Sequence, residues 1–445
     1  MLTSLYSKRV LLSTGLTNAT VFLKDGVIDD IVNGKIERPN YTLSDFGNSV
    51  IMPGLIDSHV HINEPGRTDW EGFESATYSA AAGGITTLID MPLNSSPVTT
   101  TKDALETKIR ASEGKLFVNC GFWGGITPES IQYLDKLLSA GVMGIKAFLT
   151  HSGIDEFPNV SEIDLRKAMP ILKKHDAQLL VHCELEGKLS SPSVLHQEPS
   201  SYAAYLASRP KEWEDNAIKL LIQLCEEFRV KTHIVHLSSS NSIQQIQNAK
   251  EKGLPLTVET CPHYIVFNAE EIPDGETQYK CAPPIREKVN NELLWNAIED
   301  GLIDFIVTDH SPAPPAIKEL TSRNLLTAWG GIASLQFSLS AFWTEARKRN
   351  FTIENISKLM SANVAKFLQL STKKGSISIG YDADITIWNP ESSYVVDAKN
   401  IFHKHAITPY LNQELYGIVI KTYVGGTVAF DPTLNQPPNG QLILK

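Results

Sequence analysis

Cysteine is scarce in this sequence. Five cysteines occur among 445 residues, and none of them forms a Cys-x-x-Cys pair. An odd number without paired spacing argues against a disulfide framework and predicts a reducing compartment, for which we expect the cytoplasm. The first fifteen residues lack the continuous apolar core of a signal peptide, and no run of 18 apolar residues follows. We therefore expect no membrane span.

Long runs of one charge are also missing. The formal net charge is -10, from 40 basic and 50 acidic residues that are spread along the chain. This distribution argues against a nucleic acid or an anionic membrane surface as the partner. The hydrophobic content of 42% is ordinary for a globular protein, and the length allows one large and one smaller domain.

Short apolar runs alternate with helical patterns from residue 50 onward. Several runs are rich in Val and Ile, as is typical of strands buried on both faces. The candidate strands are 50–61, 84–91, 115–123, 142–149, 177–184, 231–238, 255–261 and 304–310. The clearest helical patterns between them are 161–175, 212–228 and 240–253. Eight alternations predict an α/β fold of the (β/α)8 TIM barrel type, with a doubly wound open sheet as the alternative.

The two ends of the chain follow a different pattern. Alternating segments flank Asp25-Gly26 and predict a β-hairpin with an exposed turn, and 375–390 and 417–431 are typical of strand-turn-strand units. We therefore predict a smaller all-β, sandwich-like domain formed by both termini. The predicted boundaries are 1–50 and 375–445 for this domain and 51–374 for the barrel.

Histidines and other ligand-type residues gather at the predicted strand ends, where a barrel carries its functional side chains. His59 and His61 end the first strand and point to the same side. Others lie on the fourth, fifth, sixth and eighth strands: Lys146, His182, His236 and Asp309. Taken singly, each has a simpler explanation, since a strand-end His is usually a hydrogen-bonded core residue and a buried Lys usually pairs with an acid. Packing does not explain why all of them fall at one end of five strands, so the set predicts a metal centre.

Imidazole and carboxylate ligands suit Zn²⁺ or a similar divalent ion, but an ammonium does not bind a cation. Burial and a nearby dication lower the pKa of a lysine, and its neutral amine reacts with carbon dioxide to form a carbamate. Such a carbamate on Lys146 is an anionic oxygen donor able to bridge two ions. We therefore predict N6-carboxylysine at position 146 and two divalent ions, zinc first, with manganese, cobalt or iron as alternatives.

Several motifs, in this order, resemble those of the cyclic amidases of the amidohydrolase superfamily, and the resemblance covers most of the chain. They include "MPGLIDSHVH" (52–61), "GIKAF" (144–148), "VHCE" (181–184), "HIVHLSS" (233–239), "ETCPHY" (259–264) and "TDHSP" (308–312). The resemblance implies one metal site of His59, His61 and carboxylated Lys146, and a second of Lys146, His182 and His236. It also implies that Asp309 binds metal and shuttles a proton, and that the enzyme is a homotetramer.

Within this family, four stretches are most similar to the allantoinase subfamily: "HINEPGRTDWEGF" (61–73), "DMPLNSSP" (90–97), "KCAPPIR" (280–286) and "AWGGIASLQ" (328–336). The similarity implies a small-molecule substrate, allantoin, whose cyclic amide is hydrolysed to allantoate in purine degradation. Asn63 and Ala282 replace the Arg and Asn usual in dihydroorotases, and His151 replaces the Tyr usual in hydantoinases.

Despite this difference, a hydantoinase or dihydropyrimidinase activity is the first alternative to allantoin hydrolysis, and a dihydroorotase activity is a weaker one. A non-enzymatic scaffold is a third reading, because some relatives of this fold have lost their metal ligands. Every expected ligand is present here, which argues against that reading. We expect substrate contacts from Asn94, His151, Ser152 and Ser311.

Overall fold

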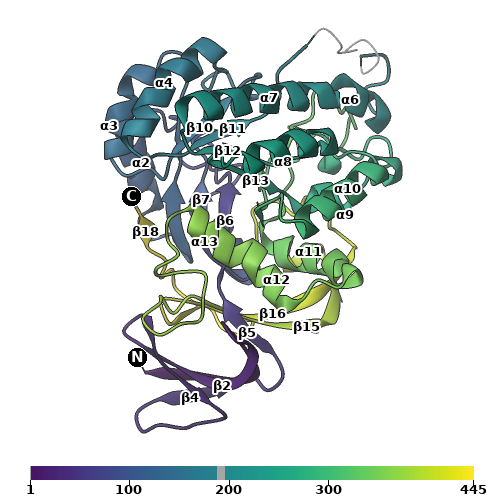
Figure 1. Ribbon diagram of the computed structural model, residues 1–445. Coiled ribbons are helices and arrows are strands. Elements are labelled where there is room, and N and C mark those ends of the chain that lie inside the picture. The colour runs from purple at the N-terminus through teal and green to yellow at the C-terminus, as the bar shows by residue number, and fades with distance from the viewer. Residues whose placement is uncertain (1, 188–195) are drawn as a thin grey trace.

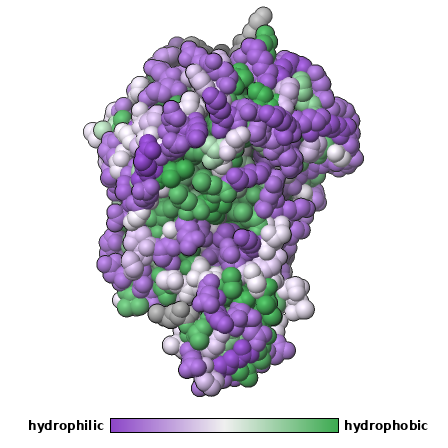
Figure 2. Space-filling view, turned by 90° about the vertical axis from the view of Figure 1, so that its left-hand side faces the viewer, coloured by the Kyte–Doolittle hydropathy of each residue, from purple (hydrophilic) through white to green (hydrophobic). Residues whose placement is uncertain are grey.

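The computed structural model, which describes residues 2–187 and 196–445, has two parts. Figure 1 shows a barrel surrounded by helices, with a separate sheet below it that combines the first and last parts of the chain. Figure 2, turned by 90°, shows the same two parts, with a mostly hydrophilic surface and one larger hydrophobic area on the upper part. No helix within the described ranges is both long and apolar enough to cross a membrane.

The barrel confirms the predicted (β/α)8 fold. Its strands are β6 Leu55–Val60, β7 Ile85–Asp90, β8 Asn119–Phe122, β10 Ile145–Phe148, β11 Leu179–His182, β12 Thr232–Ile234, β13 Leu256–Thr260 and β14 Phe305–Ile306. Neighbouring strands pair in parallel, and the short β9, Gly124–Gly125, continues β8 and pairs with β10. The ring closes where the backbone N–H of His61 donates to the carbonyl of His310 at 2.8 Å. This closure excludes the open sheet that the sequence left as an alternative.

Helices lie outside the barrel strands. They are α1 Phe73–Ala82, α2 Lys102–Ser112, α3 Leu134–Ser139, α4 Glu162–Lys174, α6 Tyr202–Ser208, α7 Lys211–Phe228, α8 Ile243–Glu251, α9 Pro262–Val266, α10 Lys288–Glu299, α11 Ser338–Ala346, α12 Ile353–Ser357 and α13 Asn363–Phe367. In α7 the buried residues recur every three or four positions, from Trp213 to Leu224, so one face packs on the barrel. A capping box formed by Ser161 and Asp164 begins α4, which lies within the helical pattern 161–175.

Both termini contribute to one eight-stranded sheet, which confirms the predicted all-β region. Its strands are β1 Thr3–Leu12, β2 Gly15–Lys24, β3 Val27–Asn33, β4 Thr42–Asp45, β5 Val50–Pro53, β15 Ile385–Val395, β16 Glu414–Val424 and β17 Thr427–Phe430. The order is β17-β16-β15-β5-β1-β2-β3, with β4 paired to β1. The inner residues of these strands, including Leu5, Val21 and Ile385, form a hydrophobic cluster separate from the barrel core. Because β5 directly precedes β6, this sheet is joined to the first barrel strand.

The terminal segments differ from the sequence prediction in detail. The hairpin turn adopts positive φ at Asp25 and Gly26, and Asp25 is exposed whereas Gly26 is partly buried. In the segment 375–390 only the second half forms a strand, β15, and its hairpin partner is β16. The last strand, β18 Leu442–Ile443, pairs with β8 of the barrel. The domain boundaries given above stay a prediction.

Candidate active site

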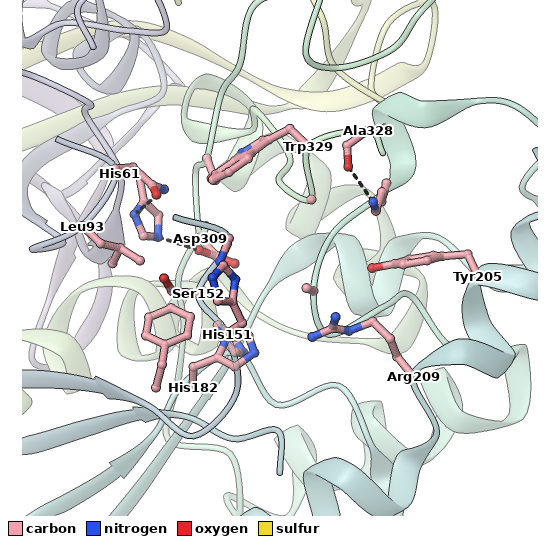
Figure 3. A pocket seen from close by; sticks show the side chains of 18 of the residues that line it. His61, Leu93, His151, Ser152, His182, Tyr205, Arg209, Asp309, Ala328 and Trp329 are labelled. Atoms are coloured by element: carbon pink, nitrogen blue, oxygen red, sulfur yellow. Dashed lines mark hydrogen bonds and ion pairs between the residues drawn. The ribbon is translucent and has the colours of Figure 1, made fainter. Parts of the chain in front are cut away.

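One cavity of about 530 Å³ opens at the carboxyl ends of the barrel strands (Figure 3). The six residues that the sequence singled out as ligands all line it: His59, His61, Lys146, His182, His236 and Asp309. The four expected substrate contacts line it too: Asn94, His151, Ser152 and Ser311. Residues that lie as much as 250 positions apart in the sequence are therefore brought to one place.

The first group of ligand-type atoms comes from the ends of the first and the last barrel strand, β6 and β14. The Nε2 atoms of His59 and His61 lie 3.2 and 3.3 Å from Oδ1 of Asp309. The ligand atoms of these three residues all lie within 4.8 Å of one another, which is compatible with a single divalent ion. Asp309 adopts a φ of +47°, a left-handed conformation uncommon for a residue with a side chain. Such strain is typical of functional sites.

The second group of ligand-type atoms consists of the imidazoles of His182 and His236, which also line the cavity. Nδ1 of His182 is 3.0 Å from Nε2 of His236, and both imidazoles are buried. Burial lowers the pKa of both, so both rings are neutral near pH 7. His236 also has a positive φ of +40°, and its Nδ1 finds no hydrogen-bond partner within the described chain. Two neutral imidazoles that face each other in this way suit a shared cation.

Lys146 lies between these groups on β10 and is fully buried. Its Nζ forms no hydrogen bond and no ion pair with any residue that the structure describes, and it lies 5.1 Å from the ring centroid of Phe148. Burial lowers its pKa to about 8, although the carboxylates of Asp309 and Glu259 partly oppose this shift. An unpaired ammonium does not fit beside a dication, whereas a carbamate on the same nitrogen supplies an oxygen donor.

Two buried glutamates orient the imidazoles, and neither was among the residues predicted to form the site. Glu259 on β13 accepts from Nδ1 of His59, and its other oxygen lies 3.0 Å from Nε2 of His233. Glu184 accepts from Nε2 of His182 at 2.7 Å. Glu184 lies in the motif "VHCE" and Glu259 in "ETCPHY", both next to strand ends. This position was the feature of the sequence that could have indicated a role in the site.

The two glutamates differ in charge environment. Burial raises the pKa of Glu259 well above its usual range. Burial also disfavours the carboxylate of Glu184, but an ion pair with Arg209 and the contact with His182 outweigh it and hold that pKa below its usual range. Glu184 therefore keeps its negative charge near neutral pH.

The expected substrate contacts have protein partners of their own. Nδ2 of Asn94 lies 3.3 Å from Nδ1 of His61, so this side chain orients a candidate ligand. The hydroxyl of Ser152 donates to the carbonyl of Phe157 at 2.6 Å and holds its own loop. His151 is more than half exposed at the cavity rim. Ser311 accepts from the indole N–H of Trp329 at 3.4 Å, and Trp329, which the sequence analysis did not single out, covers part of the cavity (Figure 3).

Comparison with known proteins places this site in a family. The model of the Amidohydrolase family matches residues 50–429. The chain is 43% identical to the allantoinase of Arabidopsis thaliana, over 95% of this chain and 87% of that one. It is 43% identical to the allantoinase of Streptomyces avermitilis, over 99% and 98% of the two chains, and 38% identical to that of Saccharomyces cerevisiae, over 95% and 94%.

Solved structures agree with this match. The L-hydantoinase (dihydropyrimidinase) from Arthrobacter aurescens superposes with a TM-score of 0.92 at 28% identity and covers 100% of both chains. A D-hydantoinase superposes with a TM-score of 0.90 at 26% identity, over 99% and 98% of the two chains. With a family model that matches most of its length and relatives of this identity, the chain belongs to the amidohydrolase family.

Proposed function

We propose that the protein is an allantoinase, which hydrolyses the cyclic amide bond of allantoin and gives allantoate. The observation that carries the proposal is the convergence of four imidazoles, one lysine and one carboxylate around a single cavity. Relatives named allantoinase match the chain over nearly its full length, which supports allantoin as the substrate.

The family is metal-dependent, and we propose that the cavity holds two divalent ions, with zinc as the first choice. His59, His61, Asp309 and carboxylated Lys146 would hold the first ion, and Lys146, His182 and His236 the second. When bound, such ions polarise an amide carbonyl and lower the pKa of water, so that hydroxide is available near pH 7. Manganese, cobalt and iron suit the same donors.

The glutamates fix which nitrogen of each imidazole faces the ions. Because Glu259 accepts a hydrogen bond from Nδ1–H of His59, the lone pair of Nε2 is directed toward Asp309 and the cavity. Because Glu184 accepts from Nε2 of His182, Nδ1 of that ring is free to face His236. Partners of this kind set the tautomer of a ligand, and an ionised partner such as Glu184 also raises its basicity.

Asp309 is the proposed proton carrier. Its carboxylate faces the cavity with its side chain 12% exposed, so it reaches both the attacking water and the ring of a bound substrate. It accepts the proton of the water at its free oxygen and returns it to the leaving ring nitrogen. An amide nitrogen is a poor leaving group, so this return is the step that most requires the carboxyl group.

A comparison of kcat/KM for allantoin, hydantoin, dihydrouracil and dihydroorotate tests the proposal. We expect allantoin to be the best substrate, and chelator-treated protein to serve as the inactive control. A preference for hydantoin or dihydrouracil would favour the hydantoinase alternative, which the solved structures of similar fold support. Dihydroorotate is expected to be poor, because Asn63 occupies the sequence position of the Arg usual in dihydroorotases. Protein that retains no metal in metal-replete buffer would point to a scaffold.

Two finer predictions concern the assembly, which the family resemblance implies, and the location of the protein. We propose a homotetramer, which analytical ultracentrifugation of the metal-loaded protein tests. We also propose a cytoplasmic location, for which the five buried, unpaired cysteines are the supporting observation. Fractionation of the native cells tests the location. One relative, from Aquarana catesbeiana, is named a mitochondrial allantoinase, so a mitochondrial fraction is the alternative outcome.

A further inference from the structure

Two buried lysines hold one wall of the cavity, Lys280 as a lining residue and Lys318 from behind it, and the proposed mechanism uses neither. Lys280 begins the motif at 280–286, and Lys318 lies in the loop between β14 and α11; they are 9% and 3% exposed. Neither ammonium pairs with a carboxylate of the described chain. A buried ammonium is costly unless its protons find acceptors, so the acceptors indicate what these side chains do.

Lys318 uses its three protons on backbone carbonyls. Its Nζ donates to the carbonyl of Lys280 at 3.0 Å, to that of Trp329 at 3.0 Å and to that of Gly331 at 2.5 Å. Burial lowers the pKa of Lys318 to about 7, and in the protonated form all three protons of Nζ are used, since an ammonium has three protons and no acceptor. The ammonium thus joins the segment that follows α9 to the loop that follows β14.

Lys280 strengthens the same junction from the other side. Its Nζ donates to the carbonyl of Ala328 at 2.5 Å, the contact drawn in Figure 3, and to that of Leu326 at 3.3 Å. Its own carbonyl accepts from the N–H of Gly331 at 2.9 Å. The hydroxyl of Tyr205 fixes the next peptide by donating to the carbonyl of Cys281 at 2.6 Å.

The held segments are those that form the cavity wall. Ala282 and residues 326–330 line the cavity, and the backbones of Ala282 and Gly330 lie side by side. Two consecutive glycines give this loop unusual freedom. At Gly331 a side chain is excluded, because a Cβ would lie 2.5 Å from the carbonyl oxygen of Ser311. A loop that must contain glycine at this contact needs other means to stay in one conformation.

We propose that Lys318, assisted by Lys280, is a positioning residue that fixes the wall of Ala282 and Ala328–Gly330 against which the cyclic substrate binds. The proposal rests on the proposed function in that it assumes a small cyclic amide in this cavity. A small rigid ring makes few contacts with the protein. Displacement of the wall by about 1 Å therefore costs as much as 10²-fold in kcat/KM. When Nζ is protonated, its hydrogen bonds hold a carbonyl about twice as strongly as those of a neutral donor. The lysines therefore govern how tightly the ring is held, while the ligand-type residues across the cavity stay in place.

The test is Lys318→Met, which keeps most of the length of the side chain and removes the donors. We expect KM to rise about 10-fold or more and kcat to stay within about threefold, the pattern of lost substrate binding. Metal content should equal that of the wild type. Lys374→Met is the matched control, since Lys374 is equally buried but pairs with Asp382 and Asp384 away from the cavity. Its KM should not change even if its thermal stability falls.

The measurement uses whichever of the four cyclic amides the wild type hydrolyses best, so a failure of allantoin as substrate leaves this test intact. A KM within about twofold of the wild type, or a kcat that falls as far as KM rises, would overturn the positioning role. If Lys318→Met does not fold, Lys280→Met provides the same readout with two contacts removed. If neither folds while Lys374→Met does, the lysines serve the fold and the proposal is wrong.

Discussion

Asp309 is the residue on which the proposed proton transfers depend. Asp309→Asn keeps an oxygen that faces His59 and His61 but cannot accept and return a proton. We expect kcat to fall about 10²–10⁴-fold while most of the bound metal is retained. Steady-state kinetics with metal analysis of the same sample checks this. Asp304→Asn, at the opposite end of β14 where Asp304 pairs with Lys250, is the control and should turn over normally. Near-wild-type turnover by Asp309→Asn would refute the proton-carrier role.

Replacement of Lys146 should weaken the binding of both ions, because its carbamate is proposed to contact both. We expect Lys146→Ala to lose metal and activity together. Propionate at millimolar concentration should restore part of both, since its carboxylate replaces the missing anionic oxygens. Propionamide has the same shape without the charge and should restore neither. Equal rescue by both compounds, or a metal-loaded but inactive Lys146→Ala protein, would contradict the bridging role.

The lowered pKa of Lys146 sets the pH at which the metal-free protein can be reactivated. Only the neutral amine forms a carbamate, and burial lowers the pKa from 10.5 to about 8. At a fixed pressure of carbon dioxide, the rate of reactivation with zinc should therefore rise from pH 7 and level off above about pH 9. With a lysine of ordinary pKa, the rate of reactivation would keep rising beyond pH 10. A rate that climbs without a plateau would show that the amine titrates normally.

Single residues at strand ends could be predicted from the sequence, whereas their partners could not. His59 and His61 were visible because spacing by two and a preceding apolar run need no knowledge of other segments. The bond from His59 to Glu259 joins residues 200 positions apart, and Lys318 contacts backbone carbonyls, which carry no residue type. Contacts of this kind follow from tertiary structure and leave no periodic pattern.

At the scale of elements, helix α4 allows a test of stability without a test of chemistry. The hydroxyl of Ser161 accepts from the backbone N–H of Asp164 at 3.3 Å and begins the helix on the outside of the barrel. Ser161→Ala should lower the free energy of unfolding by about 1 kcal/mol and leave kcat unchanged. Denaturant titration measures it, with the exposed Ser139→Ala as a control that should change little. A loss of kcat in Ser161→Ala would mean that α4 contributes to the site.

The segment before β15 shows where pattern reading fails for an element. Residues 375–379 alternate in hydrophobicity as a strand does, and Ile377 is indeed buried against the terminal sheet. They nevertheless make no ladder, because β15 already has β5 on one side and β16 on the other. Alternation reports which side chains are buried, and it does not report whether a neighbouring strand has a free edge.

For the whole molecule, the last residues should contribute to the stability of the barrel and not to its chemistry. β18 lies on β8, and the N–H of Cys120 donates to the carbonyl of Gln441 at 2.9 Å. Deletion of residues 439–445 removes these backbone bonds, each worth about 1 kcal/mol, and exposes β8. We expect a lower thermal midpoint with unchanged kcat at 25 °C. Replacing the exposed residues 432–435 by Gly and Ser should leave the midpoint unchanged, and equal losses in both proteins would contradict the role of β18.

The sheet that unites both ends of the chain also fixes the order of events on the ribosome. β5 leaves the exit tunnel early, but its neighbour β15 lies about 330 residues later, from residue 53 to residue 385. At about 5–20 residues per second, translation takes roughly 17–66 s to supply it. Throughout that interval β5 presents an unpaired edge while the barrel is still being made, and such an edge pairs readily with another nascent chain. Cells that make this enzyme should therefore need a chaperone to cover the N-terminal strands until synthesis is nearly complete.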